Sequence, residues 1–73
     1  MEATYQVKLT FSSNLTERQK DDIVETLLNT LIHQANTGGI VPDDAEGWTE
    51  TISVSREDSG AFLGRNLMTG ELI

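Results

Sequence analysis

The chain has no cysteine, one histidine and one proline among its 73 residues. Disulfides and cysteine-based zinc sites are therefore excluded, and a single imidazole cannot form a histidine metal cluster. Small domains have little core and are usually stabilised by disulfides, by a metal ion or by self-association. With the first two routes closed, we expect a homo-oligomer without a cofactor.

Basic residues are also scarce, since five lysines and arginines face twelve acidic residues, for a net charge of −7. Direct nucleic-acid binding needs basic side chains that displace counterions from phosphates, so we expect none. The negative charge favours solubility and attraction to a basic protein partner. No apolar run approaches the roughly 20 residues of a membrane span, and the N-terminal residues lack the pattern of a secretory signal. We expect a cytoplasmic protein that binds no membrane.

The apolar residues change their period within the first 37 residues. Alternate residues are apolar at first, which predicts a strand over about residues 2–12 with one buried face. The spacing then becomes helical, which predicts an amphipathic helix over about residues 16–37. The alternating positions are Ala3, Tyr5, Val7, Leu9 and Phe11, and the helical ones are Ile23, Val24, Leu27, Leu28, Leu31, Ile32 and Ala35.

Thr16, followed three residues later by Gln19, predicts an N-terminal capping box, and Gly38–Gly39 predicts the helix end. The seven apolar positions span about half of the helix circumference, whereas a helix on one sheet needs a stripe of roughly 100°. A second element should therefore cover the helix, either the C-terminal tail or another copy of the chain. The first turn is less apolar, and we expect it to project past the core toward a partner.

The second half of the chain is predicted to contain an acidic loop at 43–47, a strand over about residues 48–56 and a turn at 57–60. The tail, residues 61–73, is apolar and contains glycine, and Thr69–Gly70 could form a hairpin turn. A third strand, a short hairpin and an arm over the helix are all compatible with it. The predicted fold class is α+β in a single small domain, 1–73, with one long helix on one face of a small sheet. The element order is β-α-β with an additional C-terminal strand or hairpin, and a parallel crossover would be right-handed.

One short motif lies in this tail. The residues from Gly64 to Gly70, G-R-N-L-M-T-G, resemble the DNA-binding arm of the HU/IHF family, whose pattern is G-R-N-P-x-T-G. Leu67 replaces the proline with which that family wedges DNA. Nothing else in the chain fits the family, whose arms are basic and belong to a helical dimer body. We interpret the match as chance together with shared hairpin chemistry.

Two groups of residues could carry chemistry. His33 is the one candidate for acid-base catalysis, but it lies on the polar side of the predicted helix, where a surface histidine is the simpler interpretation. The acidic loop could bind a hard cation, but the alternating oxygen ligands of an EF-hand are absent. We expect neither a catalytic nor a metal site.

The sequence favours a non-enzymatic protein–protein interaction module, a small acidic accessory or inhibitor protein that self-associates. The alternative is an acidic nucleic-acid mimic, encoded by a phage or mobile element, that inhibits a DNA- or RNA-binding protein. A third reading is a small enzyme whose site forms between subunits. The candidate partner-binding residues are Glu17, Asp21, Asp22, Glu25, Asp43, Asp44, Glu46 and Trp48. Trp48 is either a residue at the edge of the core or an interface hot spot.

Overall fold

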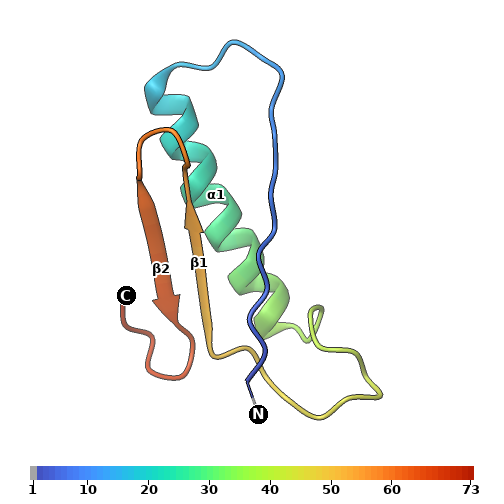
Figure 1. The fold of residues 1–73 in the computed structure, drawn as a ribbon. Helices are drawn as coiled ribbons and strands as arrows, with labels where there is room; N and C mark the ends of the chain where they lie inside the picture. The colour runs from blue at the N-terminus through green and yellow to red at the C-terminus, as the bar shows by residue number, and fades with distance from the viewer. Residues whose placement is uncertain (1) are drawn as a thin grey trace.

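A computed structural model describes residues 2–73 as one helix and a β-hairpin. Helix α1 (Glu17–Asn36) is followed by strands β1 (Thr51–Ser55) and β2 (Phe62–Asn66), which pair antiparallel with Ser53 opposite Gly64. The helix lies behind the hairpin and covers one of its faces (Figure 1). The α+β class is therefore confirmed, with one helix packed on a small sheet.

The ends of α1 follow from local side-chain chemistry. The Thr16 hydroxyl accepts a hydrogen bond from the Gln19 N–H at 3.1 Å, and the Gln19 side chain accepts one from the Thr16 N–H at 2.9 Å. These bonds satisfy two of the four backbone donors that a helix start leaves unpaired. Thr37 caps the other end, and Gly38 then adopts a φ of 78°, which glycine tolerates without strain.

The core of the described residues is small. Val24 and Leu28 of α1 are each 4% exposed, and Ile52 of β1 is 9% exposed. Val24 and Leu28 lie at the centre of the apolar arc of the helix, so the hairpin covers the middle of that arc. The arc is therefore wider than the surface that the hairpin covers.

The tail forms the short hairpin that was one of three alternatives. After β2 the Asn66 side chain accepts hydrogen bonds from the N–H groups of Met68 and Thr69, which closes a turn. Leu72 then bridges Arg65, and the Ile73 N–H donates to the Gly64 carbonyl at 3.0 Å. The motif that resembles the HU/IHF arm is thus β2 and its tight turn.

The segment predicted as the first strand differs from the prediction. Residues 2–12 are extended and run along the molecule (Figure 1), but they belong to no strand, and no backbone hydrogen bond joins them to another part of residues 2–73. Tyr5 and Val7 are 86% and 85% exposed. The alternation of apolar residues predicts a buried face, but a strand also needs a neighbouring strand to pair with. Within one chain, this segment has no buried face and no paired neighbour. The predicted β-α-β order is therefore observed only as α1–β1–β2.

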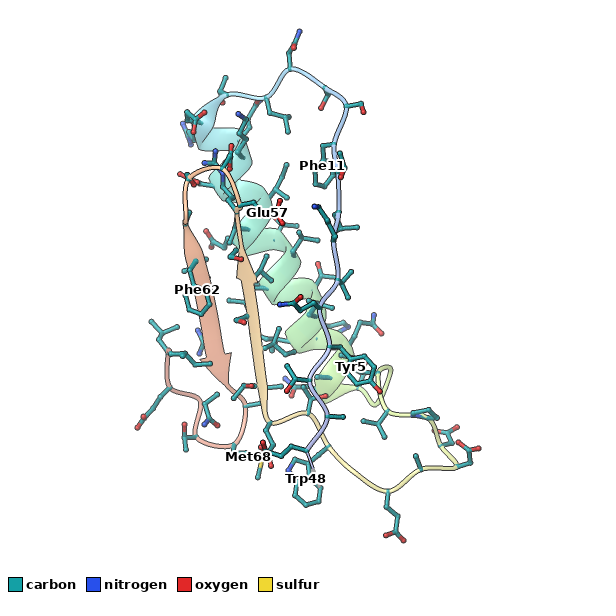
Figure 2. The ribbon with its side chains drawn as sticks, in the orientation of Figure 1. Tyr5, Phe11, Trp48, Glu57, Phe62 and Met68 are labelled. Atoms are coloured by element: carbon teal, nitrogen blue, oxygen red, sulfur yellow. The ribbon has the colours of Figure 1, made fainter. Side chains whose placement is uncertain are left out.

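β1 is shorter than the predicted strand over 48–56. The chain turns at Leu67, whose N–H donates to the Glu50 carbonyl at 2.7 Å, so residues 48 and 49 have no β2 residue opposite them. Trp48 precedes the strand and is 67% exposed, which excludes a place in the core of this chain. Figure 2 shows Trp48 and Met68 at the same end of the molecule.

Replacing Leu28 with alanine should lower the free energy of unfolding by about 2–5 kcal/mol, because it removes one of few buried side chains. The change is comparable with the whole stability of a small domain. We expect loss of the cooperative transition in urea, followed by far-UV circular dichroism. Met68→Ala, at a side chain that is 63% exposed, is the control and should unfold close to wild type. Equal effects of the two variants would contradict this description of the core.

Candidate interaction surface

Arg56 forms ion pairs with acidic residues at the start of α1. It directly follows β1, and its side chain is only 9% exposed. Its Nη1 atom is 2.7 Å from Asp21 Oδ1, and its Nη2 atom is 2.9 Å from Glu17 Oε2. Asp58 in the hairpin turn accepts two more bonds, from Nε at 3.0 Å and from Nη2 at 2.8 Å. Three carboxylates therefore surround one guanidinium.

This arrangement corrects the prediction that the first helical turn projects past the core. Glu17 and Asp21 are engaged within the chain, because Arg56 joins them to the hairpin turn. Lys20 adds contacts of 3.3 Å to Glu17 and 3.8 Å to Asp58. The first turn of α1 is thus a contact between helix and hairpin, and much of its negative charge is neutralised locally.

The ion pairs shift the ionisation of their members. Hydrogen bonds from Arg56, and then from Lys20, lower the pKa of Glu17, because they stabilise its charged form. Hydrogen bonds from Arg56 likewise lower the pKa of Asp58. The carboxylates of Asp58, Asp21 and Glu17 raise the pKa of Arg56, which stays charged at every ordinary pH.

Asp22 and Glu25 lie on the β2 side of α1. They line a shallow depression of about 260 Å³ between the helix and residues 61–63, together with Asp21, Val24 and Phe62. Both carboxylates are exposed. Of the four acidic helix candidates, these two are the ones that face solvent without an ion pair to Arg56.

The acidic loop lies at the other end of the molecule from the start of α1 (Figure 1). Asp43, Asp44 and Glu46 are exposed there, and Glu46 shares a second shallow depression with Trp48 and Glu50. The candidate residues therefore form two separate groups rather than one continuous acidic strip. No three His, Asp or Glu side chains in the described part of the chain come together as a metal site.

His33 lies in the last turn of α1, and its side chain is exposed. Its backbone carbonyl accepts hydrogen bonds from the N–H and the hydroxyl of Thr37, at 3.1 and 3.0 Å. Across residues 2–73, no side-chain hydrogen bond of His33 occurs, and His33 lines neither of the two depressions described above. Within the same range, no helix has the length and apolar character needed to cross a bilayer.

Exposed apolar side chains form a further surface, outside the predicted partner-binding residues. One group lies on the extended segment and a second on β2 and the tail, as Figure 2 shows for Tyr5, Phe11, Phe62 and Met68. Alternation along residues 2–12 is the sequence signal for the first group, but alternation alone predicts a face buried in the core. The first group is Tyr5, Val7, Leu9 and Phe11, and the second is Phe62, Leu63, Met68, Leu72 and Ile73.

Comparison of the chain with protein-family models, with curated proteins and with solved structures finds no match.

Replacing Arg56 with methionine should reduce the loss of folding stability that the protein undergoes as the pH is lowered into the acid range. Glu17 and Asp58 have lowered pKa values in the folded protein, so they add stability above their ordinary values of 4.5 and 3.8. That stability is lost as the pH falls through the lowered folded values. The urea concentration at the wild-type unfolding midpoint should therefore decrease as the pH is lowered beneath 4.5. The decrease should be modest and clearest at low salt, because both carboxylates are exposed.

The matched control is Arg18→Met, which removes the same charge from an exposed position of α1. Arg18→Met should keep the wild-type pH dependence, whereas Arg56→Met should lower the midpoint near neutral pH and reduce its fall in acid. Identical pH profiles for the two variants would show that the Arg56 ion pairs do not stabilise the fold.

Proposed function

We propose that this protein is a non-enzymatic interaction module that associates with itself. The observation that carries the proposal is the accessible surface of 6290 Å² for a chain of 8.0 kDa. A folded monomer of that mass exposes about 4,500 Å². The chain thus exposes about 1,800 Å² more than a typical monomer, and large apolar side chains contribute to this surface.

The dimensions of the chain support the same proposal. Its radius of gyration is 13.6 Å, whereas a compact domain of this length has a value of about 11 Å. One partner of a standard interface contributes about 800 Å², and obligate dimers bury more. The excess surface of one chain is therefore as large as the contribution of one subunit to an obligate dimer.

The accessory or inhibitor role extends this proposal to a second protein. The exposed acidic loop and the neighbouring Trp48 offer a surface that suits a basic partner, because aromatic side chains with a charged rim are typical of interface hot spots. A catalytic role at a subunit interface has less support, since His33 is exposed and lies outside both depressions.

Nucleic-acid mimicry has weaker support from the same geometry. A mimic of double-stranded DNA needs about one negative charge for every 1.7 Å of its length. Here one acidic cluster surrounds Arg56, and the other lies at the opposite end of a molecule 41 Å long. The negative charges are too few and too divided to copy a continuous phosphate array.

Equilibrium sedimentation at micromolar concentration should show a dimer or a larger species. Apolar contacts persist at high ionic strength, so 1 M salt should leave this association unchanged or strengthen it. A monomer across the micromolar range would contradict the proposal. Dissociation by salt would show that charges, rather than the apolar surface, hold the copies together.

Charge reversal at Asp43, Asp44 and Glu46 separates the two functions. If apolar surface drives self-association, the triple lysine variant should sediment as wild type does. The mimic hypothesis instead places its activity in these carboxylates, so the variant should then lose binding to a basic partner. Loss of self-association in this variant would contradict the assignment of that contact to apolar surface.

A further inference from the structure

The outer edge of β1 has unpaired backbone groups. The Arg56 N–H donates to the Ala61 carbonyl at 2.8 Å, and the Leu67 N–H donates to the Glu50 carbonyl at 2.7 Å. Even-numbered residues of β1 therefore bond toward β2, because the direction of the backbone groups alternates along an antiparallel strand. The N–H and C=O groups of Thr51, Ser53 and Ser55 point to the outer edge. An edge of this kind can accept another strand.

The opposite edge of the hairpin is already occupied. Residues 71–73 run beside β2, where the Asn66 N–H donates to the Glu71 carbonyl at 2.8 Å and the Ile73 N–H donates to the Gly64 carbonyl. The bridge between Arg65 and Leu72 lies between these two bonds. In the described part of the chain, the edge that remains open along its length is that of β1.

Residues 2–12 have the conformation and position of the missing strand. They are extended, lie on the β1 side of the hairpin and run in the same direction as β1 (Figure 1). Lys8 Nζ is 3.6 Å from Glu57 Oε2, just beyond the end of β1. Because the helix lies behind the hairpin, the path from this segment through α1 to β1 is right-handed, as parallel crossovers are.

The uncovered flank of α1 faces the same edge. Asp21, Asp22 and Glu25 lie on the β2 side, where they line the depression with Phe62 and Leu63. At 100° per residue, the opposite flank, away from β2, carries three apolar residues that the hairpin leaves partly exposed. These are Ile23, Leu27 and Leu31, the last of which is 39% exposed.

If residues 2–12 form a parallel strand at this edge, their apolar and polar sides match the helix-covered and open faces of the sheet. Ile52 and Val54 face the helix, so Thr51, Ser53 and Ser55 lie on the open face. If the apolar residues of the segment cover the flank of α1, its polar residues continue the open face, with Gln6 beside Ser53 and Lys8 beside Ser55. This register places Lys8 diagonal to Glu57, the residue with which Lys8 pairs within one chain.

We propose that residues 2–12 of a second copy of this chain occupy the β1 edge as a parallel strand, so that two copies exchange their N-terminal segments. This proposal rests on the self-association proposed above. Within one chain the segment lies near the edge, but it leaves Tyr5 and Val7 more than four-fifths exposed and forms no backbone bond with β1. Exchange of one segment is a common route to a dimer.

The surface area favours a second copy over closure within one chain. A strand from the same chain would cover the β1 edge, but it would leave Phe62, Leu72 and Ile73 exposed on β2 and the tail, on the other side of the hairpin. The excess of about 1,800 Å² per chain exceeds the roughly 800 Å² that one partner contributes to a standard interface. A second copy brings a strand for the edge and a further surface beside it.

The absence of cysteine makes disulfide mapping direct. Neighbouring strands are about 4.8 Å apart, which suits a disulfide between facing residues. Gln6→Cys and Ser53→Cys proteins should form a covalent heterodimer when they are mixed and oxidised, because the strand comes from another chain. Gln6→Cys mixed with Asn29→Cys, on the exposed polar side of α1, is the control and should give little product.

The double variant Gln6→Cys/Ser53→Cys distinguishes the occupants of the edge. Covalent dimers are expected. A monomer with an internal disulfide would overturn the proposal, because the segment of the same chain would then be the occupant. Efficient dimers of Ser53→Cys alone would overturn it as well, since two β1 edges would then pair with each other.

A pair of proline variants tests the backbone bonds without cysteine. In the proposed register the Val7 N–H donates to the Ser53 carbonyl, whereas the Gln6 N–H points away from β1. Val7→Pro should weaken dimerisation by about tenfold or more, since it removes a ladder bond and a buried side chain. Gln6→Pro should change the dissociation constant less than about threefold. Equal effects of the two would overturn the parallel strand.

The failure of this proposal differs from the failure of self-association. If the wild-type protein sediments as a dimer but the Gln6→Cys and Ser53→Cys variants form no cross-link, the self-associating module stands and strand exchange is overturned. A wild-type protein that stays monomeric at micromolar concentration overturns both.

Discussion

The fold depends on the packing of α1 against β1, where Val24, Leu28 and Ile52 are buried, because neither element is stable without the other. A two-stranded hairpin is marginal in water, and an isolated helix of 20 residues is only partly formed. Hydrophobic burial between them is the main term that offsets the entropy of ordering the chain. This contact covers only the centre of an apolar arc that spans half of α1. The remaining apolar surface of the helix, the segment before it and the tail are the features from which the functional proposals follow.

Arg56 makes a second connection between the same two elements. Its guanidinium joins Glu17 and Asp21 of α1 to Asp58 of the hairpin turn, with all four side-chain contacts between 2.7 and 3.0 Å. Because these carboxylates are used inside the chain, the acidic surface left for a partner is smaller than the net charge of −7 indicates. The acidic loop, together with Asp22 and Glu25, holds most of it. An interaction through apolar surface therefore has better support than one through phosphate mimicry.

Helix caps and turns could be predicted from the sequence, whereas strand pairing and ion pairs between residues far apart in the chain could not. The Thr16–Gln19 capping box and the Thr69–Gly70 turn involve residues at most a few positions apart, so their side chains alone determine them. The strand predicted over residues 2–12 needs an edge to pair with, and alternation says nothing of where that edge lies. Arg56 was overlooked because its partners Glu17 and Asp21 are 39 and 35 positions away. Trp48 is exposed because β2 ends at Asn66, opposite Thr51, so no residue of β2 lies opposite Trp48.

In the proposed dimer, the open β1 edge of each chain is filled by a second copy. Amide hydrogen exchange at Thr51, Ser53 and Ser55 reports directly on this edge, since their N–H groups point away from β2. The account predicts that exchange at these three amides slows markedly as the protein concentration rises through the dimerisation range, while exchange at Val54, which bonds to β2, changes less. Slow exchange that does not depend on concentration would show closure within one chain. Fast exchange at every concentration would show an edge that stays open, and either result would contradict the account.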